Sequence, residues 1–349
     1  MGRRLWILAI ALLTLLTVAD AILWRIAVRR LETCFDAWAA ERKAAGWVVS
    51  RGSTTSGGFP LAATLTVNDV TVAMGEPDMP GGLTGHAAGI ILRVALTEPR
   101  TLGIEAKGPQ RFRLAGADEL AVTASRLMAA VNLEAEADPR ELDLLMENVK
   151  VALRTGGDPA GTLSIGKARC HFEFSREAGQ GEPALKFSVE SEALVLPSVV
   201  RWPLGTKVAL ATIEGAVVGP LPPVQALKPW AMAWRDGGGS LELQHLLLGW
   251  GPLSLSASAT LALDDQLQPM GAGNSRLTGY EATLDALAAS GALTKSAVIA
   301  AKAVLSLLAG TPAEGDTADV DVPLTLQYRT LSMRQVPLVR LPELDWPGQ

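Results

Sequence analysis

The stretch LSLSASATLAL, residues 253–263, alternates strictly between apolar and small side chains. Leucine or alanine occupies every odd position, and serine, threonine or alanine stands between them. Because successive side chains of a β-strand point to opposite faces, this pattern predicts an uncharged strand with one apolar face. Such a face can lie against a packed core, a lipid bilayer or a bound ligand.

The same period of two recurs along most of the chain from Gly57 onward. The other alternating runs lie at residues 61–74, 90–96, 120–124, 187–195, 241–243 and 320–326. Within the first run the apolar parity changes between Val67 and Val70, which predicts a β-bulge. Breaks rich in glycine, proline and aspartate separate the runs, among them MPGG, TGGDPAG and RDGGG. The pattern therefore predicts a mainly β (α+β) fold, with a large curved antiparallel sheet or a half-open barrel.

Residues 279–309 depart from this period. Leu284, Leu287 and Ala288, and then Val298, Ala301 and Leu305, recur at helical spacing, with a break at Ser290-Gly291. We expect a helix pair packed on the sheet. The pair can cover the whole apolar face and make a closed core, or cover part of it and leave a trough, and both arrangements fit the leucines and alanines.

The amino terminus, residues 1–24, predicts a membrane anchor. The apolar run from Leu5 to Trp24 spans about 30 Å as a helix, the thickness of a bilayer core, and Asp20 falls near its end. A cleaved signal peptide is the rival, because Ala19-Asp20-Ala21 resembles a processing site. We favour the anchor. The residues expected to hold it in the membrane are Leu5, Trp6, Leu12, Leu16 and Trp24.

Residues 25–46 predict an amphipathic helix that continues the anchor and ends at Gly46, and residues 47–349 then form the β-rich domain. Three arginines after the span outnumber Arg3 and Arg4 before it, which by charge alone favours a cytoplasmic domain. A short basic tail before an apolar run is, however, the ordinary form of an export signal. We therefore expect an inner-membrane protein with its main domain in the periplasm.

Composition disfavours several classes of protein. The 31 basic and 36 acidic residues give a net charge of -5, so nucleic acid is not an expected partner. Cys34 and Cys170 match no zinc or redox motif, and their pairing stays open.

Motifs for chemistry are weak throughout. The three histidines His86, His171 and His245 lie far apart and predict no metal site. Gly271-Ala272-Gly273 lacks the third glycine of a dinucleotide loop. Asp316, Asp319 and Asp321 could suggest a calcium site, but Asp319 and Asp321 are better explained as the solvent-facing positions of a strand. We expect neither a catalytic site nor a cofactor.

Tryptophan is the unusual aromatic residue, with nine copies. Trp202, Trp230, Trp234 and Trp250 lie close together in sequence, and they can provide an apolar ligand surface, a core or a membrane-near rim. The candidate contacts to an apolar ligand combine the last of them with the opening strand: they are Trp250, Leu253, Leu255, Leu261 and Leu263.

A family resemblance rests on residues 237–273, which begin GGGSLELQHLLLGWGPLSLSASATLALDD, on DVPLTLQYRTLSMRQVPLVRLPELDWP at 321–347, and on the segment Gly58-Phe59-Pro60-Leu61. Together with the amino-terminal anchor, these resemble the domain of unknown function 2125 family of Gram-negative bacteria. The resemblance implies an envelope protein with one amino-terminal span and no known chemistry. The layout is also loosely similar to AsmA-like envelope proteins, which are associated with lipid handling.

These observations predict a non-catalytic, membrane-anchored envelope protein that binds lipid or another apolar ligand in a sheet-lined groove. The alternative is a structural scaffold or a protein-partner-binding module of the envelope. The inner membrane is the expected partner, and other protein partners stay open.

Overall fold

The computed structural model describes residues 2–75, 82–114, 119–133, 140–155, 158–223, 227–308, 319–333 and 336–346. The helices are α1 (Gly2–Ala44), α2 (Leu227–Asp236), α3 (Tyr280–Ala289) and α4 (Lys295–Leu308). The strands are β1 (Val48–Ser50), β2 (Thr54–Gly57), β3 (Ala62–Met74), β4 (Leu83–Ala95), β5 (Glu98–Leu114), β6 (Leu120–Thr123), β7 (Arg126–Asn132), β8 (Arg140–Thr155), β9 (Asp158–Phe174), β10 (Pro183–Val195), β11 (Lys207–Val218), β12 (Ser240–Trp250), β13 (Leu253–Leu263), β14 (Pro269–Thr278), β15 (Val320–Gln327), β16 (Thr330–Met333) and β17 (Val336–Arg340).

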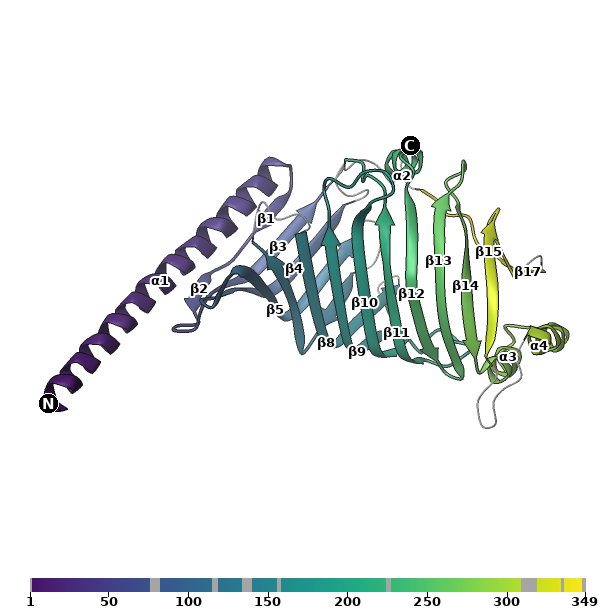
Figure 1. Ribbon diagram of the computed structural model, residues 1–349, viewed down its shortest axis with the longest axis horizontal. Coiled ribbons are helices and arrows are strands. Elements are labelled where there is room, and N and C mark those ends of the chain that lie inside the picture. Colours follow the sequence, from purple (N-terminus) through teal and green to yellow (C-terminus); the bar gives the residue numbers. More distant parts are fainter. Residues whose placement is uncertain are drawn as a thin grey trace.

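The strands form one antiparallel sheet of 17 strands among the described residues. From β2 to β17 each strand pairs with its neighbour in the chain, except that β6 and β7 both lie between β5 and β8 and pair with these two strands rather than with each other. The short strand β1 pairs with β3. The predicted antiparallel sheet is confirmed. In Figure 1 the first strands run diagonally, whereas β12 to β15 stand nearly upright, so the sheet is strongly twisted. Helix α1 projects from one end of the sheet, and α3 and α4 lie at the other.

Bulges contribute to this twist because an extra residue on one strand bends it locally, as in β5, which carries one extra residue opposite Ala87 to Gly89 of β4. The predicted change of parity in β3 falls on Asp69, which has φ 50°. It is not the predicted bulge, because the register with β4 is the same on both sides: Asn68 pairs with Gly89 and Val70 with Ala87. Asn148 in β8 and Ala193 in β10 likewise adopt positive φ and leave the register of their strands. The register resumes unchanged after each of these three residues, and the apolar side chains that follow stay on the same face.

Helix α1 is continuous from Gly2 to Ala44 and so joins the two segments that the sequence predicts separately. Trp6, Leu12 and Leu16 are 72%, 58% and 57% exposed, and the side chain of Leu5 lies outside the described residues. Among the described residues α1 alone is long and apolar enough, by length and composition, to cross a membrane. Its second half packs on the sheet: Val28, Leu31 and Phe35 are buried there. Their partners in the sheet are Ala63, Leu65, Val67, Val70, Leu92 and Val94.

Helices α3 and α4 form the predicted pair at the far end. The first ends at Ala289 with Ser290 as its C-cap, and Gly291 follows with φ 78°, as the sequence break indicates. Residue 309, the last of the predicted helical range, lies outside the described residues. The pair buries Tyr280, Leu284, Val298 and Leu305 against Val320, Val322 and Met333 of β15 and β16.

The sequence did not predict α2, which connects β11 and β12 and lies at the ends of the strands (Figure 1). Trp234 on this helix is buried, donates from Nε1 to the carbonyl oxygen of Val218 at 3.2 Å, and covers Gly239, where a Cβ would meet its ring. The tryptophans that lie close in sequence form two separate pairs, Trp230 with Trp234 and Trp202 with Trp250. The pairs stand at opposite ends of β12, about 30 Å apart, and so make no common surface.

Candidate functional site: an apolar sheet face between two capped ends

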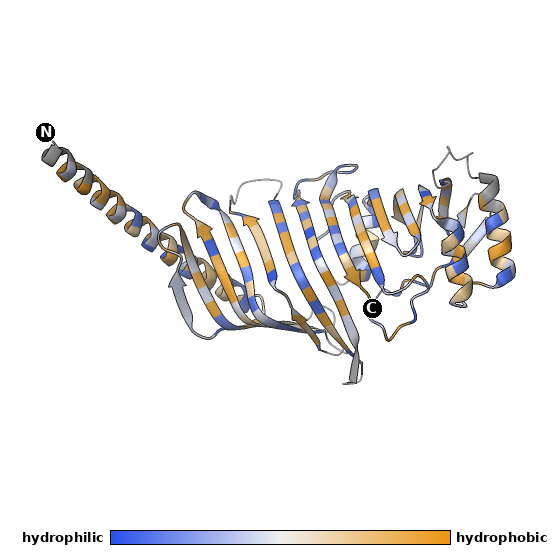
Figure 2. Cartoon of the chain, turned by 90° about the horizontal axis from the view of Figure 1, so that it is seen from below, coloured by the Kyte–Doolittle hydropathy of each residue, from blue (hydrophilic) through white to orange (hydrophobic). Residues whose placement is uncertain are grey.

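The sheet has one apolar and one polar face. In β13 the burial alternates without exception over Leu253 to Leu261, with the leucines and alanines half-buried and the serines and threonine exposed. Figure 2 shows the same alternation of hydrophobic and hydrophilic residues along the strands. The apolar side of the opening stretch is thus neither sealed in a core nor fully exposed to solvent.

A single row of directly paired residues crosses the apolar face from one helix-covered end to the other. The row contains one residue from each of twelve strands, β3 to β5 and β7 to β15. Its members in order, hereafter the central row, are Leu65, Leu92, Ile104, Ala129, Leu144, Cys170, Val189, Ile213, Leu246, Ala257, Ser275 and Val322. At about 4.8 Å between strands, the row is about 50 Å long. Its one polar side chain, Ser275, donates from Oγ to the carbonyl oxygen of Val322 at 3.1 Å.

Burial differs along the central row, and it is deepest under the helices at the two ends. Leu65 is fully buried under α1, and Leu92 and Ile104 belong to the same cluster. Val322, at 3% exposed, belongs to the cluster under α3 and α4. Between them Ala129 to Ala257 belong to neither cluster; Cys170 is 8% exposed, whereas Ile213 reaches 37%. Helices therefore cap both ends of the apolar face and leave its middle open.

A hollow of about 210 Å³ lies on the apolar face between β12 and β16. Its walls are leucines and its floor is small residues: Leu243, Leu246, Leu261, Leu324, Leu326 and Leu331 stand around Ala257, Ala259, Gly271 and Gly273. A Cβ at Gly271 would meet the carbonyl oxygen of Thr260, and one at Gly273 that of Ser258. The glycines thus let β14 lie close to β13 and keep the floor free of side chains.

The sequence-predicted ligand contacts all lie on the apolar face, since Trp250 pairs with Leu253 and the leucines follow at every second position. Of the five, Leu261 lines the hollow. Trp250 instead stands at the strand end, where its Nε1 donates to the carbonyl oxygen of Gly205 at 2.7 Å and its ring contacts Trp202. The sequence missed Gly271 and Gly273, whose spacing suggested only an incomplete nucleotide loop.

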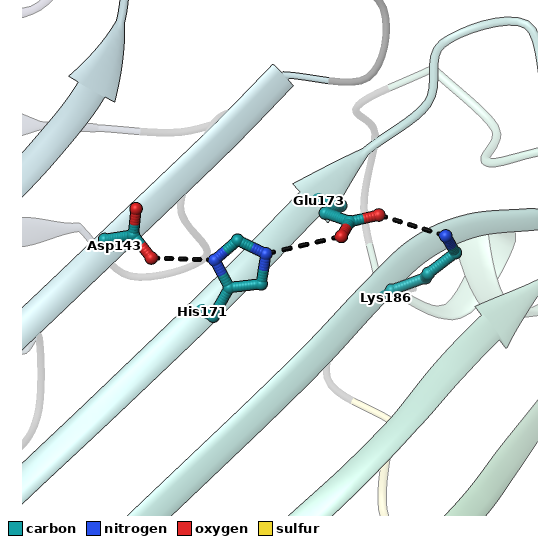
Figure 3. A network of polar contacts seen from close by, with 4 residues as sticks. All are labelled: Asp143, His171, Glu173 and Lys186. Atoms are coloured by element: carbon teal, nitrogen blue, oxygen red, sulfur yellow. Dashed lines mark hydrogen bonds and ion pairs between the residues drawn. The ribbon is translucent and has the colours of Figure 1, made fainter. Parts of the chain in front are cut away.

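The polar face carries cross-strand ion pairs. Figure 3 shows His171 between two carboxylates: its Nδ1 lies 2.7 Å from Asp143 Oδ1, its Nε2 lies 3.3 Å from Glu173 Oε1, and Lys186 Nζ donates to Glu173 Oε2 at 3.0 Å. The hydrogen bond that His171 donates to Asp143 raises the pKa of His171, and the hydrogen bond from Lys186 lowers the pKa of the Glu173 carboxyl. His245 with Glu214 and Arg276 with Asp321 repeat the arrangement on later strands.

A larger hollow of about 490 Å³ lies beside His171, and Asp143, Arg169 and Glu190 also line it. Size alone favours this hollow. The side chains of Asp143, His171 and Glu190 are 60%, 41% and 47% exposed, however, so they are solvated members of the ion-pair ladder. The apolar hollow is the better candidate because leucines there stay in contact with solvent at a cost in free energy.

The remaining sequence candidates hold structural contacts. Asp321 pairs with Arg276 at 2.9 Å, Asp319 accepts a hydrogen bond from Thr278, and Asp316 lies outside the described residues. Cys34 is exposed and Cys170 buried, and both are free; burial raises the pKa of the Cys170 thiol. Within the described ranges no group of three or more histidine, cysteine, aspartate or glutamate side chains is placed to hold a metal ion.

Comparison with protein families gives one match. The family model described as "Uncharacterized protein conserved in bacteria (DUF2125)" matches residues 24–342, from Trp24 in α1 to just beyond β17. No curated protein and no solved structure matches the chain. The resemblance predicted from the sequence is thereby confirmed, whereas the looser similarity to AsmA-like proteins is not shown.

Proposed function

The chain belongs to the DUF2125 family of uncharacterised proteins conserved in bacteria, and from that premise we propose that it is a non-catalytic, membrane-anchored envelope protein that holds lipid acyl chains on its apolar face. The ligand class is an unbranched, uncharged hydrocarbon chain, because the face offers leucine, isoleucine, valine and alanine side chains in a continuous strip.

The central row carries this proposal. Its ends, Leu65 and Val322, are buried in two clusters, while Ile213 in its middle is 37% exposed on the apolar face. Contiguous exposed apolar surface is unusual in a soluble protein and marks a place where another apolar body binds. The part of the row that no helix cluster covers, from Ala129 to Ala257, crosses seven strands and is about 29 Å long. This is close to the roughly 30 Å of a bilayer core, which holds two acyl chains end to end, so the face has room for the chains of more than one lipid.

Helix α1 supports the anchor in the same proposal. From Trp6 to Leu23 its large apolar side chains are more than half exposed, and burying them in a bilayer core contributes about 1.5 to 3 kcal/mol for each side chain that is fully buried. We propose an inner-membrane span with the sheet in the periplasm. The anchor predicts that the protein stays in the membrane fraction after carbonate washing, which removes electrostatic attachment only; release into the soluble fraction would overturn it.

Photocrosslinking from neighbouring leucines tests the ligand. Leu246 belongs to the central row and lines the apolar hollow, whereas the next residue, Leu247, is 36% exposed on the polar face. A photoreactive phenylalanine analogue replaces each in turn in living cells. We expect lipid adducts from position 246 and none from position 247, because only the first side chain reaches the apolar face.

The same experiment separates the alternative, a scaffold that binds a protein partner. Protein adducts without lipid from position 246 would favour the scaffold and overturn lipid binding. Leu247 is the matched control because it differs in the face that it presents and not in residue type or position along the strand.

A further inference from the structure

The turn between β2 and β3 places exposed apolar side chains beside α1. Phe59 and Leu61 in this turn are 51% and 76% exposed. The backbone N–H of Leu96, in the turn between β4 and β5, donates to the carbonyl oxygen of Leu61 at 3.1 Å, so the two turns lie side by side. We call Phe59, Leu61 and Leu96 the apolar rim.

Trp24 fixes the apolar rim to the end of the apolar helix segment. Its Nε1 donates to the carbonyl oxygen of Gly57 at 3.0 Å, and its ring meets that of Phe59 edge-on with centroids 5.9 Å apart. Residues 5–24 span about 30 Å, so Trp24 stands at the interface of a bilayer that the segment crosses. The rim must then lie within one side-chain length of the same interface.

Charge on α1 marks the depth independently. Arg25, Arg29 and Arg30 are exposed immediately beyond Trp24. At 1.5 Å per residue they extend about 9 Å past it, the depth at which lipid phosphates lie outside the hydrocarbon core. Arginines beyond an aromatic residue that ends an apolar run are the expected arrangement at a membrane surface.

We propose that the apolar rim inserts into the interface of the leaflet from which α1 emerges and gives the sheet a second membrane contact. This inference rests on the proposed anchor. Two contacts, the helix and the rim, fix the tilt of the sheet on the membrane. Trp24 also packs against the cluster that contains Leu65 and Leu92, so the rim adjoins the first residues of the central row. The apolar face thereby begins at the lipid surface.

Spin labels on single cysteines test the rim in the full chain. Cys34→Ser and Cys170→Ala first remove the native thiols. One of Leu61→Cys, Leu12→Cys or Ile299→Cys then provides a single site for the label. Each labelled protein is reconstituted in vesicles of phosphatidylethanolamine and phosphatidylglycerol. Ile299 is the matched control because it is a 70% exposed apolar residue on α4, at the other end of the sheet. Collision with oxygen, which favours lipid, is compared with collision with a water-soluble nickel chelate.

We expect the label at Leu61 to lie about 5–10 Å into the boundary between headgroups and acyl chains, and the label at Ile299 to collide freely with nickel. If the label at Leu61 collides freely with the nickel chelate while the label at Leu12 is shielded in lipid, the rim proposal is overturned and the anchor stays intact. Nickel access at Leu12 would overturn the anchor itself. Lipid exposure at both Leu61 and Ile299, or shielding of Leu61 from both reagents, would also overturn the rim, since these mean a flat-lying molecule or a protein contact.

Discussion

Replacing leucine by asparagine at two places on the apolar face should lower the free energy of unfolding by amounts that differ severalfold. Leu65 is fully buried under α1, so loss of its side chain leaves a cavity that lowers the free energy of unfolding by about 2–5 kcal/mol. The unpaired buried amide of asparagine lowers it further, by about 1–3 kcal/mol. Leu261 is half-buried beside the open hollow, where water can satisfy the amide. About half the burial of one leucine, roughly 1 kcal/mol, is then lost.

Thermal melting of delipidated protein in one detergent measures both variants. For a domain of this size about 1 kcal/mol lowers Tm by roughly 2 °C, so Leu65→Asn should lower it by about 6–16 °C and Leu261→Asn by about 2 °C. Equal, large losses would refute the reasoning, because they would show that Leu261 lies in a closed core and that the middle of the apolar face is not open.

Three other results are expected. In cells with an intact inner membrane, a membrane-impermeant maleimide should label the exposed Cys34 and not the buried Cys170; labelling only after lysis would place the sheet in the cytoplasm. The pKa of His171, measured by NMR, should exceed the usual value near 6.5 and should fall in the Asp143→Asn variant; an unchanged pKa in the variant would contradict the contact. Because the pKa is raised in the folded protein, the pair stabilises the fold at acid pH, and this contribution is lost as the pH rises through that pKa. Chelators should leave the melting temperature unchanged, and one equivalent of bound metal in protein purified without added ions would contradict this.

Much of the fold could be predicted from the sequence because local periodicity carries it. The alternation of Leu253 to Leu263 fixes which side chains share a face. The helix pair is visible for the same reason, in the break at Ser290-Gly291. The parity change at Asp69 marks a local break in β3, but whether one strand carries an extra residue there depends on the partner strand, and the predicted bulge was wrong. Helix α2 escaped prediction because Trp230 and Trp234 suggested a ligand surface, and the packing of Trp234 over Gly239 is a contact that only the fold reveals.

The candidate site was only partly predictable. A leucine at an alternating position is the same in sequence whether a helix covers it or not, so the difference between Leu65 and Leu261 depends on where α1, α3 and α4 pack. The floor residues Gly271 and Gly273 were equally hidden, since their role depends on pairing with β13. The central row is a property of register across twelve strands, and no local pattern specifies register between strands.

Native mass spectrometry of the full chain tests most directly whether the open apolar face holds lipid. Protein released from detergent should carry lipid adducts, and Leu246→Glu should lose them because it places a charge in the hollow, whereas Leu247→Glu, on the polar face, should keep them. Equal adducts in both variants, or none in the unaltered protein, would contradict lipid binding on this face.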